Sequence, residues 1–442
     1  MNLHAVLARV TPSADEDAAM DAVVGRLEAA VQAVMDDLGL PGRASVQGSV
    51  AKGTWLAGST DLDLFMLLDP ALDEAALKQA AQDVGSRVLE GARKMYAQHP
   101  YLIGAFEGLD VDLVPAYAVA AAGARMSAVD RTPFHTAWVR EHLDDAGAVR
   151  LAKQWCKGVG VYGADTATGG FSGYLVEVLV VLHRGFEGFI DWLAADARPR
   201  RLAHGDDEVD DDVSPLVVVD PVDAARNCAA AVHAGTLAAA IEAARAYRNG
   251  PDERFFFPRP AQGAPAARLK AALADQGAVW LGVQMTPKTD RLDIVLPQFQ
   301  RAGRMLTEAL ERDGFPVRRH RVDQVDGVSM QWVIDDVHKP ATRIHRGPAA
   351  HQEPNARKFR EKWQEAADAA GPVHEDDGRL AVEVHERIRT PVEALRHHLK
   401  TASLGKHVAA ALQDHRLHDA PPGGSWAPIV TDFILDRRPW QR

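Results

Sequence analysis

Apolar positions in the first third of the chain follow helical and strand periods in turn. Between Asp15 and Leu38 they recur every three or four residues, which predicts an amphipathic helix. A short strand is predicted at Ala44–Gln47, and a buried, mostly apolar strand at 61–68. A helix over Asp73–Tyr96 and a second apolar strand at 109–115, which ends on a proline, complete a small α/β unit.

The pattern turns helical in the middle of the chain. Helices are predicted at Val149–Gly158, Gly173–Leu193 and Pro221–Asn249. Between the last two, residues 206–212 hold six acids in seven positions, which is typical of a solvated surface loop. Prolines and glycines in Pro258–Pro265 predict a linker after this helical region.

The last third mixes both periods. A strand, an amphipathic helix and three further strands are predicted at Ala278–Met285, Leu296–Glu311, Phe315–Val322, Ser329–Asp335 and Leu380–His385. This order favours an α+β sheet of the ferredoxin or RNA-recognition-motif type. We therefore expect an α+β multidomain protein with domains at 1–141, 142–258 and 259–442, each of ordinary domain size.

Composition and charge narrow the class of protein. The chain has only two cysteines, Cys156 and Cys228, so it lacks the residues for a disulfide framework or a cysteine-ligated zinc site. Its first residues lack a signal-peptide pattern and no apolar run approaches a membrane span, so we expect a cytoplasmic protein with no membrane partner. The net charge of −11 argues weakly against nucleic-acid binding, but residues 301–362 hold 13 Lys and Arg against 9 Asp and Glu.

Two aspartates one residue apart in a buried strand indicate a metal site. Because strand side chains alternate between faces, Asp61 and Asp63 project from the same face and can share divalent cations. The Gly48-Ser49 turn upstream can aim backbone N–H groups and a hydroxyl at phosphate oxygens. A third carboxylate is expected on a neighbouring strand, with Asp112 as the first candidate and Asp110 as its rival. The alternative, a solvated edge strand, is weakened by the apolar residues around the pair.

A glycine–serine turn before an Asp-x-Asp strand resembles the active-site signature of polymerase-β-like nucleotidyltransferases. Further segments, in the same order, resemble one family of these enzymes, the archaeal-type (class I) CCA-adding tRNA nucleotidyltransferases. The matching segments are GSVAKGTW (48–55), DLD (61–63), VDLVP (111–115), SAVDRTPFH (127–135), VRLAK (149–153), VYGA (161–164), GFSGYL (170–175) and VDPVD (219–223) with Arg226-Asn227. The likeness is fainter in the last third, so its specificity comes from residues 48–227.

This resemblance implies a polymerase-β-like catalytic head at 1–141, a helical nucleotide-selecting domain at 142–258 and a tRNA-binding body and tail at 259–442. It implies that Asp61, Asp63 and Asp112 are catalytic and hold two Mg²⁺ ions. It places the contacts to ATP and CTP at Ser49, Lys52, Thr132, His135, Lys153, Tyr162 and Arg226, the last of which helps to distinguish the two nucleotides. Lys52 stands where family members also carry arginine, so a point charge replaces a bidentate fork.

Several of these residues have simpler structural alternatives. Thr132 and His135 follow an acid and precede or follow a proline, an arrangement typical of a helix start. The alternative for Lys153 is an exposed lysine on a helix, and that for Tyr162, which lies between glycines, is an aromatic residue in a turn.

Two further features bear on the nucleotide-selecting region. Asp220-Pro221 is typical of a helix N-terminus, which would leave Arg226 on a helix surface. An arginine often found in the family before the GFSG segment is missing, because Thr168-Gly169 stands there. The contacts that such an arginine would make are not expected in this protein.

Basic residues of the last third are expected to contact the acceptor arm of tRNA through its backbone phosphates. The candidates are Arg318, Arg319, Arg321, Arg343, Arg346, Arg357 and Lys358. The alternative is that these residues form an ordinary solvated face.

The sequence therefore predicts a homodimeric, template-independent enzyme that adds or repairs the 3′-terminal C, C and A of tRNA. Attack of the tRNA 3′-hydroxyl on the α-phosphate of CTP or ATP would release pyrophosphate. The alternatives are another RNA-tailing or small-molecule nucleotidyltransferase, and a non-catalytic tRNA-binding relative. The basic C-terminal region argues against a small-molecule substrate, and the complete set of carboxylates argues against a vestigial site.

Overall fold

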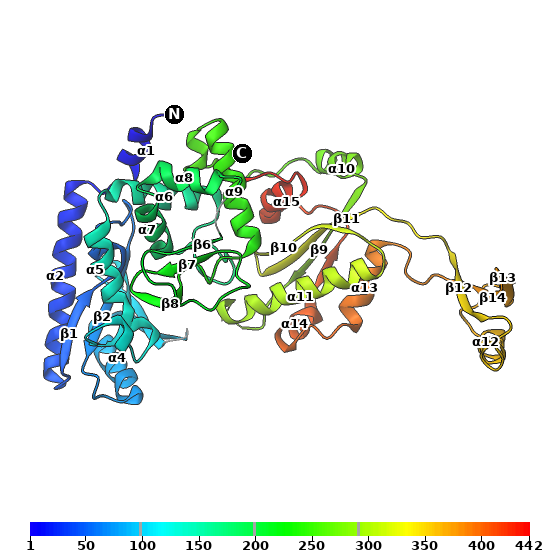
Figure 1. Cartoon of the computed structure of the whole chain (residues 1–442), viewed down its shortest axis with the longest axis horizontal. Coiled ribbons are helices and arrows are strands. Elements are labelled where there is room, and N and C mark those ends of the chain that lie inside the picture. The colour runs from blue at the N-terminus through cyan, green and yellow to red at the C-terminus, as the bar shows by residue number, and fades with distance from the viewer. Residues whose placement is uncertain (97–99, 198–199, 290–291) are drawn as a thin grey trace. The chain divides into compact units, whose positions relative to one another are not determined.

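The computed structural model describes residues 1–96, 100–197, 200–289 and 292–442 (Figure 1). It divides into two compact units. The first comprises residues 1–259 together with 438–442, and the second comprises residues 260–437. None of the described helices is long and apolar enough to cross a membrane.

The first unit begins with a five-stranded sheet in the order β1-β2-β5-β4-β3. Its strands are β1 (Gly42–Val46), β2 (Asp61–Leu68), β3 (Glu90–Tyr96), β4 (Pro100–Phe106) and β5 (Leu109–Tyr117). Strands β2 and β5 run parallel, and the other neighbours are antiparallel. One face of the sheet packs on α2 (Ala14–Asp37) and α4 (Glu74–Val88), and α1 (Leu3–Val10) precedes them. This mixed α/β sheet confirms the small α/β unit that the sequence predicts in the first third of the chain.

The predicted helix over Asp73–Tyr96 is wrong in its last turns. Helix α4 ends at Val88, Leu89 is extended, and β3 then pairs with β4 in an antiparallel hairpin. Gly91 adopts a φ of +64°, a left-handed conformation that a helix does not accept. The apolar spacing predicts that the helix continues beyond this glycine. Pairing of β3 with β4 outweighs that local helix propensity.

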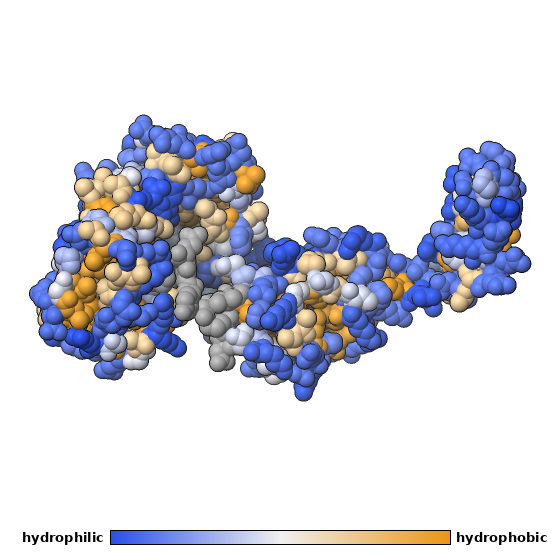
Figure 2. All heavy atoms as spheres, turned by 90° about the horizontal axis from the view of Figure 1, so that it is seen from below, coloured by the Kyte–Doolittle hydropathy of each residue, from blue (hydrophilic) through white to orange (hydrophobic). Residues whose placement is uncertain are grey.

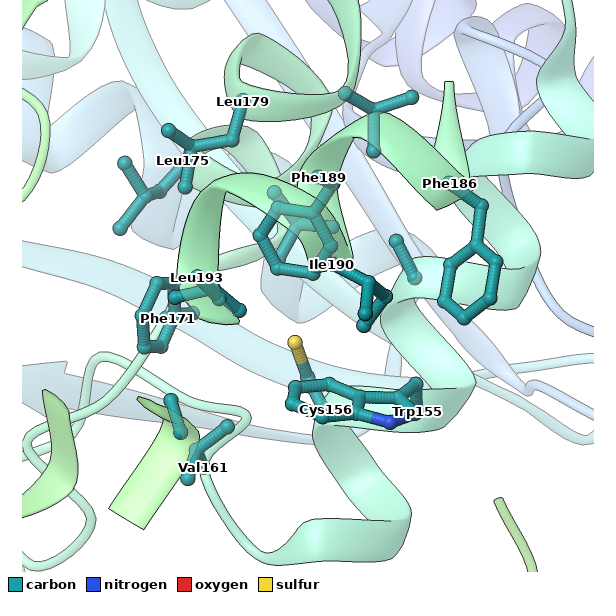
Figure 3. Close-up of a cluster of buried hydrophobic side chains, with 14 of the residues drawn as sticks. Trp155, Cys156, Val161, Phe171, Leu175, Leu179, Phe186, Phe189, Ile190 and Leu193 are labelled. Atoms are coloured by element: carbon teal, nitrogen blue, oxygen red, sulfur yellow. The ribbon is translucent and has the colours of Figure 1, made fainter. Parts of the chain in front are cut away.

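A mostly helical region follows the sheet. It contains α5 (Thr132–His142), α6 (Ala146–Val159), α7 (Gly173–Leu182), α8 (Phe186–Ala194) and α9 (Ala234–Asn249), with short strands β6 (Arg201–Leu202), β7 (Val217–Asp220) and β8 (Asp223–Asn227). Figure 3 shows its core, where Trp155 and Cys156 of α6 face Phe189 and Ile190 of α8. Trp155 is fully buried and meets Phe189 edge to face, with ring centroids 6.2 Å apart. This packing fixes α6 and α7, the two helices that supply side chains to the candidate site.

Two predicted helices in this region are interrupted. The predicted helix over Gly173–Leu193 is broken between α7 and α8, where Arg184 and Gly185 adopt φ angles of +57° and +120°. The predicted helix over Pro221–Asn249 starts only at Ala234, because Asp220 and Asp223 instead face each other in the tight β7–β8 hairpin. Asp220 is therefore not a helix cap.

The second unit is built on a four-stranded antiparallel sheet in the order β10-β11-β9-β15. The strands are β9 (Ala278–Met285), β10 (Val317–Gln324), β11 (Val328–Asp335) and β15 (Arg416–His418). Helices α11 (Leu292–Arg312), α13 (Pro391–Thr401) and α14 (Lys406–Ala411) cover one face, and α10 (Ala266–Asp275) and α15 (Ala427–Ile434) cover the other. The strands predicted over 278–285, 315–322 and 329–335 are confirmed to within two residues.

A small lobe is inserted between β11 and α13. It consists of β12 (Thr342–Ala349), α12 (Asn355–Gln364), β13 (His374–Asp376) and β14 (Arg379–His385), with the strands ordered β12-β14-β13. The predicted strand at 380–385 lies on β14. On the face seen in Figure 2 this lobe is mostly hydrophilic, as expected of a segment with few buried residues.

Candidate active site

The paired carboxylates lie on the sheet face opposite the helix-covered core. Leu62, Leu64 and Met66 of β2 are buried against α2 and α4, and alternation places Asp61 and Asp63 on the other face. The parallel register sets Asp63 directly beside Asp112 of β5 and Asp61 beside Asp110. Strands β2 and β5 thus carry four aspartates on one face, and the predicted trio is brought together.

Burial separates Asp112 from its rival Asp110. Asp112 is half-buried, and burial together with Asp63, Asp61 and Asp110 raises its pKa to about 6. Asp110 is exposed and accepts a 3.3 Å hydrogen bond from Thr60 Oγ1. Burial also raises the pKa of Asp63, although Lys52 opposes the shift. Ionisation is therefore disfavoured at both Asp63 and Asp112, chiefly because these carboxyl groups are buried.

The chemistry of these donors fits a divalent cation. They are hard carboxylate oxygens, which Mg²⁺ prefers, and a cation would offset the burial and the repulsion between carboxylates that raise the pKa values of Asp63 and Asp112. Among the described residues, no three His, Cys, Asp or Glu side chains are close enough to hold one ion by themselves.

A short helical turn, α3 (Gly48–Ala51), faces the carboxylates. Gly48 has a φ of +68°, and a Cβ atom there would lie 1.9 Å from Asp63 Oδ2. Only glycine fits both the backbone and the space. The Gln47 N–H donates a 2.8 Å hydrogen bond to the Asp63 carbonyl, which ties the turn to β2. Ser49, the next residue, lies in this turn beside the sheet face that carries Asp61 and Asp63.

A cavity of about 360 Å³ opens between the turn, β2 and the helices α6 and α7. Six predicted site residues line it: Ser49, Lys52, Asp61, Asp63, Lys153 and Tyr162. Lys157, Tyr174 and Glu177 are among its other lining residues. Asp112 instead lines a second cavity of about 390 Å³, which shares Asp61 with the first and also includes Arg93. The carboxylates thus stand between two cavities.

Two of the three lysines that line the cavity, Lys52 and Lys153, are bound to a carboxylate that the sequence analysis did not identify. Glu177 Oε2 accepts from Lys52 Nζ and Glu177 Oε1 from Lys153 Nζ, both at 2.8 Å. Thr54 Oγ1 donates to the same carboxylate at 2.6 Å. Burial alone would raise the pKa of Glu177, but Lys153 and Lys52 lower it to about 2. Lys153 is therefore a buried cation, not the exposed helix lysine of the alternative interpretation.

A second buried carboxylate, Asp220, organises His135 and Arg226. Asp220 Oδ2 contacts His135 Nε2 at 2.9 Å and accepts from Arg226 Nη1 at 2.7 Å, while Tyr174 Oη donates to Oδ1 at 2.9 Å. The rings of His135 and Tyr174 stack with centroids 3.9 Å apart. Burial lowers the pKa of His135, although Asp220 opposes the shift. Tyr174 lines the cavity, so it connects this cluster with the lysines.

Thr132 is the predicted nucleotide contact with the least structural support. It is half-buried at the start of α5, one helical turn before His135, and like His135 and Arg226 it does not line the cavity. Arg150, which the sequence analysis left without a role, donates to the carbonyls of Trp55 and Gly53 at 3.0 and 2.8 Å. It thereby fixes to α6 the loop that carries Lys52.

The missing arginine before the GFSG segment has a steric explanation at position 169. Gly169 has a φ of +50°, and a Cβ there would lie 2.0 Å from His233 Nδ1. The His233 N–H also donates to the Gly169 carbonyl at 2.8 Å. A side chain at this position would displace His233 and strain the backbone.

The predicted tRNA-contacting residues lie in the second unit, on strand β10 and in the small lobe. Arg318, Arg319 and Arg321 are in β10, where Arg319 Nη2 donates to the Ile434 carbonyl at 3.2 Å and so helps to dock the end of α15. Those of the lobe, Arg343, Arg346, Arg357 and Lys358, are exposed on β12 and α12. Ion pairs join Arg343 to Glu386 and Arg346 to Asp376 at 3.2 and 2.9 Å.

The head fold and its carboxylate row define the class of protein, a nucleotidyltransferase. Family models match along the chain: the nucleotidyltransferase domain at residues 29–135, the second domain of tRNA nucleotidyltransferase at 147–257 and the C-terminal domain of the CCA-adding enzyme at 282–418. The CCA-adding enzyme of Halobacterium salinarum is 37% identical over 415 residues, covering 92% of this chain and 90% of that enzyme. That of Haloarcula marismortui is 36% identical over 452 residues, covering 98% and 96%.

The chain therefore belongs to the family of CCA-adding enzymes, the tRNA nucleotidyltransferases that its motifs resemble. A third relative, the CCA-adding enzyme of Thermoplasma acidophilum, is 31% identical over 432 residues, or 97% of each chain. Among solved structures, CdnC from E. coli MS115-1 superposes with a TM-score of 0.45 at 18% identity, covering 58% of this chain and 92% of that one.

Proposed function

We propose that this protein builds and repairs the 3′-terminal CCA of tRNA from CTP and ATP without a nucleic-acid template. The observation that carries the proposal is the row of Asp61, Asp63 and Asp112 beside a lysine-lined cavity, within a chain that matches CCA-adding enzymes almost end to end. Each cycle transfers a nucleotidyl group to the tRNA 3′-hydroxyl and releases pyrophosphate.

The carboxylate row would hold two Mg²⁺ ions through Asp61, Asp63 and Asp112. Bound there, the ions would activate the attacking hydroxyl and neutralise the charge that develops on the leaving pyrophosphate. The chain's own contribution is to hold these oxygens at adjacent positions of two parallel strands. The position of Asp112 on the second cavity favours the entry of the tRNA 3′ end from that side.

The nucleotide would lie in the cavity lined by Ser49, Lys52, Lys153 and Tyr162. The Ser49 hydroxyl and the lysines meet the triphosphate, where buried ammonium groups attract phosphate more strongly than exposed ones do. Thr132 and His135 complete the set of contacts that the family resemblance implies. Lys52 attracts the triphosphate as a point charge, without the two-pronged contact of an arginine.

Arg226 is proposed to read the base. Asp220 engages its Nη1, so the remaining guanidinium donors are left for the nucleobase and the tRNA backbone. Its side chain is 32% exposed, whereas that of Asp220 is fully buried. Asp220 therefore orients Arg226 and is too enclosed to contact a nucleotide.

We further propose a division into domains at 1–141, 142–258 and 259–442, with a ferredoxin or RNA-recognition-motif fold in the last. The β-α-β-β-α-β order of β9, α11, β10, β11, α13 and β15 supports this fold. The exposed arginines of the second unit would contact the acceptor arm. A cytoplasmic homodimer is the form in which we expect the enzyme to act.

The decisive assay supplies purified protein and Mg²⁺ with tRNA transcripts that end at the discriminator base, at +C and at +CC. CTP and ATP are offered separately and together. Addition of C, C and then A, followed by a stop, supports the proposal. Indefinite tailing, or equal use of UTP, would show an RNA-tailing enzyme of a different specificity, and no incorporation would show a non-catalytic relative.

A further inference from the structure

The β7–β8 hairpin that carries Arg226 has an irregular register. In the ladder that the described residues form, Val219 of β7 pairs with the last residue of β8 and Asp220 pairs with its first residue. Residues 224–226 therefore have no counterpart on β7 and form a bulge, whose extra residues the neighbouring strand does not fix. Other contacts must determine where Arg226 lies.

A buried amide fixes the end of this bulge. Asn227 Oδ1 accepts from the N–H groups of Val218 and Ala229 at 3.0 and 2.8 Å, and its Nδ2 donates to the Leu216 carbonyl at 3.1 Å. Because these partners are backbone groups of the hairpin and of the segment that follows it, Asn227 holds the last residue of β8 within the hairpin itself.

A buried carboxylate fixes the start of the bulge, and its partners lie outside the hairpin. Asp223 Oδ2 contacts Arg131 Nη1 at 2.9 Å and Arg125 Nη1 at 3.1 Å. The side chains of Asp223 and Arg131 are 6% and 13% exposed, whereas that of Arg125 is 35% exposed. An ion pair removed from water is screened less than an exposed one, so Arg131 is the main anchor of Asp223.

Arg131 is connected in turn to a strand of the carboxylate row. It ends η2 (Ala128–Arg131), in which the preceding residue, Asp130, is fully buried. Asp130 Oδ1 accepts from the Tyr117 N–H at 2.9 Å, and Tyr117 is the last residue of β5, the strand that carries Asp112. A continuous series of contacts thus joins the strand of Asp112 to the start of the bulge.

We propose that Asp223 is a positioning residue for nucleotide selection. By binding Arg131, it holds the bulge of residues 224–226 at a fixed place relative to β5. Arg226 then meets the base of a nucleotide whose α-phosphate lies at the carboxylate row. This inference rests on the proposed role of Arg226 and extends it from the guanidinium, which Asp220 orients, to the backbone that carries it. A loose bulge would let the guanidinium occupy several positions and so reduce the discrimination between cytosine and adenine.

The test measures kcat/KM of the full-length protein for CTP and for ATP on tRNA transcripts that lack CCA. In Asp223→Asn the side chain keeps its size but loses its charge, so we expect the preference for CTP over ATP to fall about tenfold. We expect kcat for CTP to change far less, because the carboxylate row is untouched.

The matched control is Asp432→Asn in the second unit. The side chain of Asp432 is 4% exposed and accepts from Arg437 Nε at 2.7 Å, so it is also a buried acid bound to a guanidinium. We expect this variant to lower the melting temperature without changing the preference for CTP over ATP. An equal loss of preference in the control overturns the proposal.

Two double-mutant cycles test the path of the effect. If Asp223 acts through Arg131, adding Asp223→Asn to Arg131→Met changes the nucleotide preference little beyond the single Arg131→Met variant. Adding it to Arg226→Ala should likewise change little, because the guanidinium to be positioned is gone. Additivity in either cycle, or an unchanged preference in Asp223→Asn, overturns the proposal.

Should Asp223→Asn fail to fold, Arg131→Gln provides a milder variant. Its amide still donates a hydrogen bond to Asp223 but carries no charge, and we expect the preference for CTP over ATP to fall about threefold. An unchanged preference in this variant overturns the proposal.

Amide hydrogen exchange tests the bulge without any catalysis. The Glu208 N–H donates to the Ala224 carbonyl at 2.9 Å, so its exchange rate reports on the start of the bulge. We expect this rate to rise about tenfold in Asp223→Asn, and an unchanged rate overturns the anchoring role. If the wild-type protein fails to add CCA, the proposed function fails while this rate decides whether Asp223 anchors the bulge. If Arg226→Ala alters the preference and Asp223→Asn does not, only the role of Asp223 fails.

Discussion

The cations of the two units are held in opposite ways. In the first unit, the side chains of Lys52 and Lys153 are 6% and 3% exposed and share one buried carboxylate. In the second unit, the side chains of Arg343 and Arg346 are 56% and 57% exposed, each beside a surface acid. Buried cations act at short range in a fixed geometry, whereas exposed cations act at long range and are screened by salt. The first arrangement suits an exact position, and the second suits a large and variable RNA.

The largest effect should come from removing the carboxylate of Asp112, whose pKa is raised to about 6 by burial and by the neighbouring aspartates. Asp112→Asn is expected to lower kcat for CTP incorporation about a thousandfold, because a charge that stabilises the transition state is removed. Affinity for tRNA should stay unchanged. Asp110→Asn is the matched control, since it lies two residues away on the same face but is exposed and should retain most of its activity. The opposite order of effects would identify Asp110 as the third carboxylate.

Arg226→Ala tests the second buried cluster. Loss of the guanidinium that Asp220 orients should weaken the preference for CTP over ATP about tenfold to a hundredfold, the value of a hydrogen bond from a charged group. The measurement compares kcat/KM for the two nucleotides on tRNA lacking CCA. Arg248→Ala, on the exposed surface of α9, is the control. Equal losses for both nucleotides would give Arg226 a role in binding rather than in selection.

The carboxylate row also predicts a pH dependence. Because the pKa of Asp112 is raised to about 6, its carboxylate takes up a proton as the pH falls through this value, and the proton competes with Mg²⁺. The apparent Mg²⁺ affinity should therefore be constant above pH 7 and decline up to about tenfold per pH unit below 6. Titrations of Mg²⁺ at several pH values check this. An affinity that is constant down to pH 5 would exclude Asp112 as a titrating ligand.

The smallest effect is expected on the exposed side of the comparison. Arg343→Ala and Arg346→Ala should each weaken tRNA binding about two- to fivefold at moderate salt, as exposed charges do. Each should also make the dependence of log K on log salt shallower, by about one unit for every phosphate that the variant no longer neutralises. Arg87→Ala, exposed on α4 of the first unit, serves as the control. A salt slope equal to that of the wild type would leave these arginines as an ordinary solvated face.

The parts of the fold that follow local periods were predictable from sequence. The alternation in β2 fixed which face carries Asp61 and Asp63, and the same alternation in β5 carried Asp112. The site residues that escaped prediction depend on distant contacts instead. Glu177 lies 125 residues from Lys52, so no spacing along the chain pairs them. Its only sequence signal was a lone acid within an apolar helix.

The same reason explains the errors in secondary structure. The β3–β4 pairing and the β7–β8 hairpin are stabilised by neighbouring strands, which local propensity does not register. Asp220 illustrates the consequence: next to a proline it matches a helix start, yet His135, Tyr174 and Arg226 hold it at the end of a strand. Tertiary partners, not neighbours in sequence, determine its role.

The contact between Gly48 and Asp63 has a consequence for engineering this enzyme. A methyl group at position 48 would occupy the space of the Asp63 carboxylate, so residue 48 cannot be changed while Asp63 keeps its present position. A library that diversifies the turn alone would consist mainly of inactive clones, whatever the merit of its other substitutions. Altered nucleotide preference is better sought at Arg226, whose side chain is 32% exposed and binds Asp220 rather than β2.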